Sequence, residues 1–204
     1  MRSPDYWDEA KAHLCAVDPV IGAVIARLEE PPLRSKDQIF ETLVHSIVGQ
    51  QISAKAAEAV WGRFLSLVGS VSPKSVLEPT TEALRGVGLS GRKVEYIQGL
   101  ATAGAWVLDH PWSERTDDEV RADLISLRGV GPWTAEMVLI FTLLRPDILP
   151  LGDIGVVRAI EALYVDGARL SKEQVAAIAA PWRPYRTVGT WYLWRHLDAE
   201  PVEY

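Results

Sequence analysis

Two glycines one residue apart separate two helical patterns in the second half of this chain. Gly129 and Gly131 lie in the run from Leu127 to Ala135, and Pro132 follows directly. Glycine adopts backbone angles closed to other residues and proline is preorganised for the first turn of a helix, so this run predicts a tight hairpin that opens a helix. Unpaired N–H groups at a helix start bind phosphate without a lysine. An ordinary glycine turn is the alternative, because short motifs also occur by chance.

Helix signals dominate the chain, and alternating strand patterns do not occur. Apolar residues recur at helical spacing, as at Ile39, Leu43 and Ile47. Capping boxes, in which a hydroxyl and a downstream Glu or Gln satisfy the first N–H groups of a helix, are predicted at Ser35, Thr116 and Ser171, and Ser72 marks a further start. The sequence therefore predicts an all-α fold with helices near 5–15, 17–29, 37–50, 53–68, 73–77, 81–85, 91–109, 117–127, 132–144, 154–165, 172–180 and 185–197.

The residue inventory excludes several kinds of site. Cys15 is the single cysteine, so we expect neither an internal disulfide nor a four-cysteine metal site. The four histidines lie far apart without metal-ligand spacing, so we expect no bound metal cluster. No apolar run approaches the ~18–20 residues that span a bilayer, and no secretory signal follows Met1. We therefore expect no membrane partner and a cytoplasmic location.

The chain is acidic, with a formal net charge of −6. Phosphate neutralisation normally supplies non-specific DNA affinity, so this charge argues against a DNA ligand. The conflict eases if the acidic residues lie away from the binding face and if helix N-termini supply much of the phosphate contact. We expect weak, strongly salt-sensitive non-specific binding.

The hairpin and the later Asp153 belong to a wider pattern that runs from about Ile39 to about Leu197 and includes segments 47–53, 88–97, 181–185 and 190–192. Together these segments resemble the helix-hairpin-helix DNA glycosylases, in the branch that excises alkylated bases. The resemblance implies two helical lobes with the helix-hairpin-helix motif at the DNA-binding cleft. One lobe would take 1–35 and 145–204, and a central lobe 36–144 would end in the motif at 117–144. The segment before Ser35 is too short for the additional N-terminal α/β domain of some relatives.

Asp153 is the candidate catalytic residue. A fixed carboxylate near the anomeric carbon stabilises an oxocarbenium-like sugar and orients or deprotonates the attacking water. Asp is also a preferred N-cap, and a helix is predicted to begin here. The distance along the sequence from Trp133 resembles that of the family and favours the catalytic role, with Asp147 as the weaker candidate.

The resemblance places Trp133 where strand-cutting relatives carry a lysine nucleophile. An indole cannot form a Schiff base, so we expect a glycosylase without lyase activity. Its ring can stack on an extruded base, and a cationic alkylated purine gains about 0.5–2 kcal/mol of cation–π attraction. Trp191 is the expected second wall of this base pocket, and Met137 lies where relatives carry an aromatic residue. Less favoured as walls are Trp194, Tyr192 and Trp182.

The resemblance also implies the DNA contacts. Gln51 or Gln50 would wedge into the space that the extruded nucleotide leaves, although two glutamines in a turn are also typical of a solvent-facing loop. We expect phosphate contacts at Gly129, Gly131 and Thr134. No cofactor is required, and the hairpin carbonyls are expected to accommodate an alkali ion.

The function implied by the resemblance is a monomeric, prokaryotic, nucleoid-associated hydrolase of the cytoplasm. It would flip an alkylated base, an alkylpurine above all, out of damaged double-stranded DNA and cleave the N-glycosidic bond in base excision repair. A non-catalytic helix-hairpin-helix DNA-binding module is the main alternative. A glycosylase and lyase for oxidised bases is a second one, disfavoured by Trp133 and by the absence of a cysteine cluster.

Overall fold

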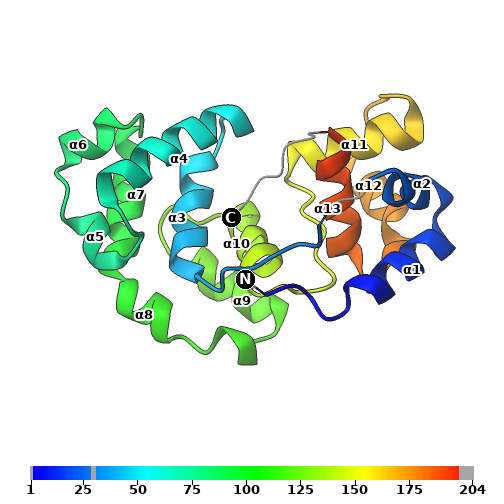
Figure 1. The fold of residues 1–204 in the computed structure, drawn as a ribbon, viewed down its shortest axis with the longest axis horizontal. Coiled ribbons are helices and arrows are strands. Elements are labelled where there is room, and N and C mark those ends of the chain that lie inside the picture. Colours follow the sequence, from blue (N-terminus) through cyan, green and yellow to red (C-terminus); the bar gives the residue numbers. More distant parts are fainter. Residues whose placement is uncertain (1, 29–30, 198–204) are drawn as a thin grey trace. The chain divides into compact units, whose positions relative to one another are not determined.

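The computed structural model describes residues 2–28 and 31–197, and these ranges are helical without a β-strand (Figure 1). Their one pairing of extended backbone is an isolated bridge between Arg2 and Ser35. The all-α prediction is confirmed. No helix in the described ranges has both the length and the apolar character needed to cross a bilayer. The α-helices are α1 (Trp7–Val17), α2 (Pro19–Arg27), α3 (Ile39–Gly49), α4 (Ala54–Val68), α5 (Pro73–Leu77), α6 (Thr81–Gly86), α7 (Gly91–Thr102), α8 (Gly104–Asp109), α9 (Asp117–Ile125), α10 (Pro132–Met137), α11 (Ile154–Val165), α12 (Lys172–Ile178) and α13 (Arg186–Leu197).

The chain divides into two compact units. One takes the described residues of 1–36 and 139–203, and the other takes those of 37–138. The terminal unit therefore holds α1, α2 and α11 to α13, and the central unit holds α3 to α10. The second boundary follows Val138, where α10 gives way to the π-helical turn η2 (Val138–Thr142), whereas the sequence-based division placed it after Leu144.

Two of the three predicted capping boxes form, at Thr116 and Ser171. The predicted box at Ser35 is wrong. The Ser35 hydroxyl is buried and donates to the Thr142 carbonyl at 3.0 Å, and α3 begins only at Ile39, without a side-chain cap. A long-range partner has therefore taken the hydroxyl that the local pattern assigned to a helix start.

The predicted helix over 91–109 is two helices, α7 and α8, which meet at Ala103. Close packing explains the break. A Cβ added at Gly104 would lie 2.4 Å from Cγ of Pro73, so the first residue of α8 lies against the first residue of α5. Only a glycine permits this approach.

Helix α3 forms the centre of the central unit and contacts α4, α7, α8 and α10 (Figure 1). Leu43, Val44, Ile47 and Val48 are fully buried. Burial of each such side chain contributes about 1.5–3 kcal/mol to folding. The packing of α3 thus fixes the position of its C-terminal end, from which the loop to α4 starts.

Helix α13 has the corresponding role in the terminal unit, where it contacts α1, α2 and α11. The same unit contains a buried carboxylate, Asp18, which caps α2. Asp18 accepts hydrogen bonds from the Trp182 indole at 2.8 Å and from the Tyr164 hydroxyl at 2.7 Å. A buried charge is stable only with such partners. Asp18 therefore connects α2 to α11 and to the segment that precedes α13.

Candidate active site

The hairpin between α9 and α10 depends on Gly129. Its φ is +91°, and a Cβ at this position would lie 2.3 Å from Cγ of Tyr96. A side chain would therefore be excluded by both backbone conformation and space. Gly131 differs, because it is the N-cap of α10 in an extended conformation and has open space around its α-carbon. No side chain in the described ranges caps α10.

Gln50 connects the C-terminal end of α3 to this hairpin by hydrogen bonds. Its Nε2 donates to the Gly129 carbonyl at 3.0 Å and to the Thr134 hydroxyl at 3.0 Å. Thr134 is 1% exposed. Both the Gln50 amide and the Thr134 hydroxyl thus hold the hairpin together, and the part of Thr134 left for a phosphate is its main-chain N–H.

Lys93 strengthens the same end of α3. Its Nζ donates to the Val48 carbonyl at 2.7 Å, and burial lowers the pKa of Lys93. A cation beside the last carbonyls of a helix is favourable because these groups carry partial negative charge.

Gln51 differs from its neighbour Gln50 in both backbone and exposure. It has a φ of +58°, unusual for a residue other than glycine, and its side chain is exposed. Ser53 then caps α4 by accepting from the Ala56 N–H. Backbone strain at a non-glycine residue often marks a functional position. Of the two glutamines, Gln51 has the exposure that a wedge requires.

Asp153 is the N-cap of α11, as the alternative interpretation of the sequence predicted. Its Oδ1 accepts from the Val156 N–H at 2.9 Å and from the Trp194 indole at 3.0 Å. The next residue, Ile154, is 66% exposed, so this carboxylate lies at an accessible helix end. Capping and catalysis are therefore compatible roles for the same side chain.

Asp147, the weaker catalytic candidate, is neutralised by two arginines. Its carboxylate accepts from Arg183 Nη1 at 2.8 Å and from Arg186 Nε at 2.6 Å and Nη2 at 3.0 Å. A carboxylate held in this way has little capacity to stabilise another cation. Because Arg186 is the first residue of α13, we interpret Asp147 as a residue that holds the start of this helix.

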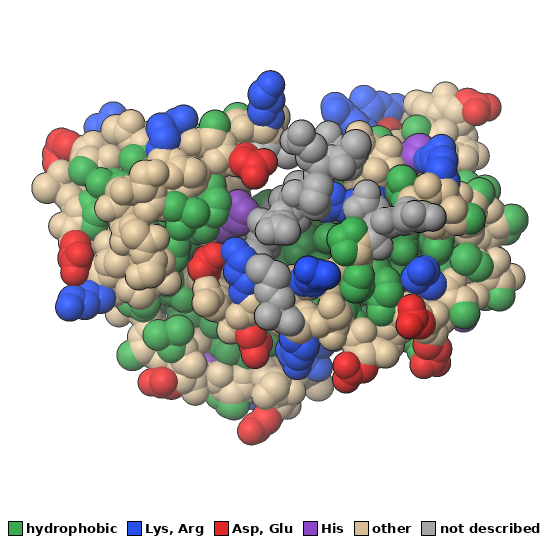
Figure 2. All heavy atoms as spheres, viewed as in Figure 1, with side chains coloured by type: hydrophobic (Ala, Val, Ile, Leu, Met, Phe, Trp, Pro, Cys, Tyr) green, Lys and Arg blue, Asp and Glu red, His purple; other side chains and the backbone are tan. Residues whose placement is uncertain are grey.

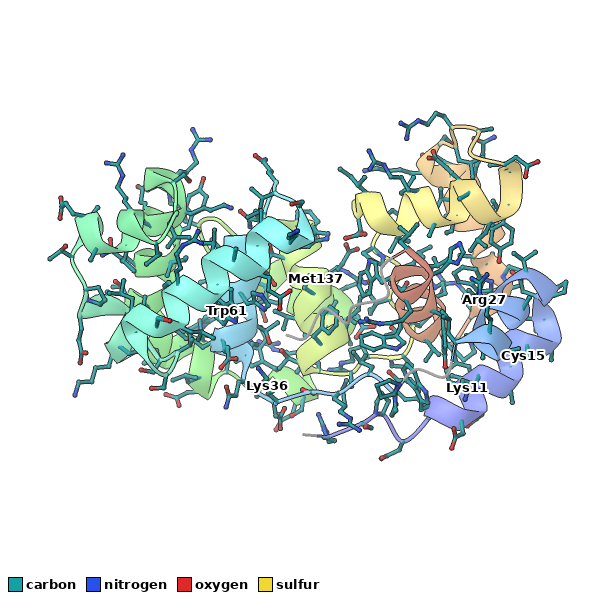
Figure 3. The ribbon with its side chains drawn as sticks, turned by 45° about the horizontal axis from the view of Figure 1, so that its top comes forward. Lys11, Cys15, Arg27, Lys36, Trp61 and Met137 are labelled. Carbon is teal, nitrogen blue, oxygen red and sulfur yellow. The ribbon has the colours of Figure 1, made fainter. Side chains whose placement is uncertain are left out.

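The predicted pocket aromatics have different surroundings. Trp133 is partly exposed on α10. Met137, at the end of the same helix and labelled in Figure 3, is 1% exposed. Trp191 is 5% exposed and lies in the core of the terminal unit, with Trp7 packed edge-on against it and the Arg195 guanidinium 4.4 Å from its ring centroid. Burial favours packing roles for Met137 and Trp191, and their places in a base pocket remain predictions.

Trp194, which the sequence ranked below Trp191, is the tryptophan in contact with Asp153. It is half-buried and stacks on Phe141 with ring centroids 5.5 Å apart. Its indole N–H reaches Asp153, whereas the buried Nε1 of Trp191 has no hydrogen-bond partner in the described ranges. Two tryptophans three residues apart on one helix look alike in sequence, and only a polar partner for one of them separates the two.

Acidic residues gather at the end of α9 remote from the hairpin. Asp117, Asp118 and Glu119 occupy its first turn, and the hairpin follows its last turn. Nine residues of helix place these charges about 13 Å from the hairpin end. On the face shown in Figure 2, acidic and basic side chains occur on both units. In the described ranges, no group of three His, Cys, Asp or Glu side chains is arranged to hold a metal ion.

The model of the HhH-GPD superfamily of base excision DNA repair proteins matches residues 44–184, which include the α3–α4 loop, the hairpin and Asp153. This chain belongs to the HhH-GPD superfamily. A DNA-3-methyladenine glycosidase structure from Bacillus halodurans has 34% sequence identity and a TM-score of 0.76, over 96% of this chain and 92% of that chain. The 3-methyladenine DNA glycosylase of Schizosaccharomyces pombe in complex with abasic DNA has 26% identity and a TM-score of 0.83, over 96% and 100%.

A further HhH-GPD relative is DNA-3-methyladenine glycosylase 1 of Schizosaccharomyces pombe. It is 30% identical over 166 residues, which make up 78% of this chain and 73% of the relative. These relatives confirm the resemblance to the alkylated-base branch and the all-α class of the fold.

Proposed function

We propose that this chain is a DNA glycosylase that extrudes alkylated bases, alkylpurines above all, from double-stranded DNA and hydrolyses their N-glycosidic bonds. One observation carries the proposal. In a member of the HhH-GPD superfamily, the Asp153 carboxylate is held at the accessible N-terminus of α11 by the Val156 N–H and the Trp194 indole. The names of the relatives support alkylated bases as substrates.

In the proposed reaction, the bond between the anomeric carbon and the base breaks, and its electron pair leaves with the base. A cationic alkylpurine departs as a neutral molecule, so no acid is needed to protonate it. The Asp153 carboxylate stabilises the oxocarbenium-like sugar by its charge. Water adds to the anomeric carbon and gives up its proton to Asp153 or to solvent. An abasic site remains.

We propose that the enzyme lacks lyase activity. Trp133 supplies an indole where strand-cutting relatives have an amine, so no Schiff base with the sugar can form there. Borohydride trapping tests this point. The enzyme should give no covalent adduct with damaged DNA, whereas a trapped adduct would contradict the proposal.

Base recognition in this proposal relies on aromatic faces. We assign base stacking to the partly exposed ring of Trp133, and Trp194 presents a half-buried ring beside the carboxylate. Such faces attract a cationic purine. We assign the wedge to Gln51, because the Gln50 amide already binds the hairpin.

We assign the phosphate contact to main-chain N–H groups at the start of α10, in the stretch from Gly129 through Gly131 to Thr134. Support comes from the missing side-chain cap of α10 and the open space at Gly131. The hairpin also has oxygens suited to an alkali ion. Among the described residues, the Leu127 carbonyl accepts a hydrogen bond from the Val130 N–H and the Gly129 carbonyl accepts one from the Gln50 amide. A carbonyl oxygen has two lone pairs, so each can also face a cation. Such an ion would neutralise phosphate charge.

We further propose that the protein acts as a monomer in the prokaryotic cytoplasm and requires no cofactor for hydrolysis. A non-catalytic DNA-binding module is the competing function. Incubation with randomly methylated duplex DNA, followed by identification of the released bases, separates the two. Release of methylated purines is the expected result. Tight DNA binding without release of any base from a panel of lesions would overturn the proposal in favour of the binding module.

A further inference from the structure

We infer that Trp194 and Gly155 are positioning residues that together fix the orientation of the Asp153 carboxylate. This inference rests on the proposed function, in which Asp153 acts on the sugar. Neither residue needs to touch the sugar for this role. The indole directs the carboxylate, and the glycine leaves the space in which the carboxylate and the indole meet.

The first observation is that two donors bind the same carboxylate oxygen. Oδ1 of Asp153 accepts from the Val156 N–H at 2.9 Å and from Trp194 Nε1 at 3.0 Å. An N-cap side chain normally needs only the bond to its own helix. The indole bond comes from a residue 41 positions away, on α13. Because a carboxylate is planar, two donors at Oδ1 also set the direction of Oδ2.

The second observation is that Trp194 is itself held in place. Its ring stacks on Phe141 with an interplanar angle of 14°, and α13 packs along α11. A donor on a rigid support loses little conformational freedom when it forms its bond. The Trp194 N–H therefore keeps its direction when the enzyme is free, before any substrate is bound.

The third observation is the space at Gly155, in the first turn of α11. A Cβ at this position would lie 3.0 Å from Asp153 Oδ1 and 3.5 Å from Cδ1 of Trp194. The carboxylate would have to shift by a few tenths of an ångström, whereas the indole would lie in ordinary van der Waals contact with the added methyl group. Glycine is disfavoured in helices relative to alanine, so helix formation does not explain its presence here. Gly152, three residues earlier, has no atom within 4 Å of its would-be Cβ.

Trp194→Phe tests the indole bond, because phenylalanine keeps an aromatic face and loses only the donor and part of the ring. We expect the single-turnover rate of base excision to fall about 10- to 100-fold, the loss typical of one hydrogen bond to a charged group. Affinity for damaged DNA should stay within about twofold. The matched control is Trp182→Phe, which removes an indole bond to a different carboxylate, Asp18. It should lower the melting temperature and leave the excision rate unchanged.

Gly155→Ala fills the space next to the Asp153 carboxylate and leaves both hydrogen-bond donors in place. This variant is informative even if Trp194→Phe fails to fold. Excision should fall at least about tenfold while the melting temperature stays equal or rises, because alanine favours the helix. Gly152→Ala, in open space, should excise at the wild-type rate. Wild-type rates in both Trp194→Phe and Gly155→Ala would overturn the positioning role.

Asp153→Asn separates failure of this inference from failure of the proposed function. If Asp153→Asn abolishes excision while Trp194→Phe and Gly155→Ala excise normally, only the positioning role is lost. If Asp153→Asn excises like the wild type, the catalytic assignment of Asp153 is lost, and the inference with it.

Discussion

The side-chain amide of Gln50 donates a hydrogen bond of 3.0 Å to the main-chain carbonyl of Gly129, 79 positions further along the chain. A second bond from the same nitrogen reaches Thr134 on α10. These two hydrogen bonds therefore fix the C-terminal end of α3 relative to the hairpin. The loop that carries Gln51 starts at this fixed end of α3. The position of the proposed wedge and the shape of the proposed phosphate contact depend on the same side chain.

Gln50→Ala should destabilise the protein by about 1–3 kcal/mol, because it removes two hydrogen bonds and leaves the buried Thr134 hydroxyl without this partner. Urea unfolding measures the change, with the slope of the transition unaltered. Gln51→Ala, which removes an exposed side chain, is the variant whose unfolding is compared. If Gln50→Ala were as stable as the wild type, the role of Gln50 in connecting α3 to the hairpin would be contradicted.

Gln51→Gly should lower excision without loss of stability. The φ of +58° at this position suits glycine, so the backbone should relax, while the wedge is removed. We expect an excision rate reduced about tenfold, consistent with the few kcal/mol that base extrusion requires. A mismatched pair opposite the lesion should reduce the defect, because such a base is already easier to extrude. An undiminished rate on fully paired DNA would remove the wedge assignment.

Gly129→Ala and Gly131→Ala form a matched pair within the hairpin. The first places a Cβ on the Tyr96 ring at a left-handed φ and should destabilise by about 2 kcal/mol or more. The second meets open space and should unfold like the wild type. Its added methyl group should still hinder approach of a phosphate and weaken DNA binding several-fold. Thermal unfolding and fluorescence anisotropy with abasic DNA distinguish these effects, and identical behaviour of the two variants would contradict the account.

The helical framework could be predicted from sequence because it depends on local signals. The Thr116 and Ser171 caps formed as predicted, since their partners lie three residues away. The Ser35 cap failed because its hydroxyl has a partner 107 residues away. Long-range contacts also decide the roles of Gln50 and Gln51, which are neighbours of the same type. The pairing of Trp194 with Asp153 has the same origin, because no local pattern specifies which indole of α13 meets α11.

The lowered pKa of Asp18 predicts that the terminal unit loses stability at low pH. Burial alone would raise the pKa of Asp18, but hydrogen bonds from the Trp182 indole, the Tyr164 hydroxyl and two main-chain N–H groups hold it below its ordinary value. A pKa lowered on folding stabilises the protein above the unfolded value of about 3.9, and this contribution is lost as the pH falls through the lower folded value. Stability should therefore fall on acidification below about pH 4.

Asp18→Asn tests the predicted loss of stability at low pH. The variant should be less stable than the wild type at pH 7 by about 1–3 kcal/mol, and the difference should shrink as the pH falls toward 3. Urea unfolding across this range measures it. Glu78→Gln, an exposed carboxylate, is the control and should follow the wild-type curve. A pH-independent difference for Asp18→Asn would show that the charge of Asp18 does not contribute.

The most direct test is the single-turnover excision of a methylated purine by Asp153→Asn at saturating enzyme. Asparagine keeps a cap oxygen and approximate shape, so folding and DNA binding should be retained while the charge is lost. We expect the rate to fall by about 10²- to 10³-fold or more, with little change in affinity for the DNA. Excision at the wild-type rate by a folded, DNA-binding Asp153→Asn protein would contradict the catalytic role of the Asp153 carboxylate.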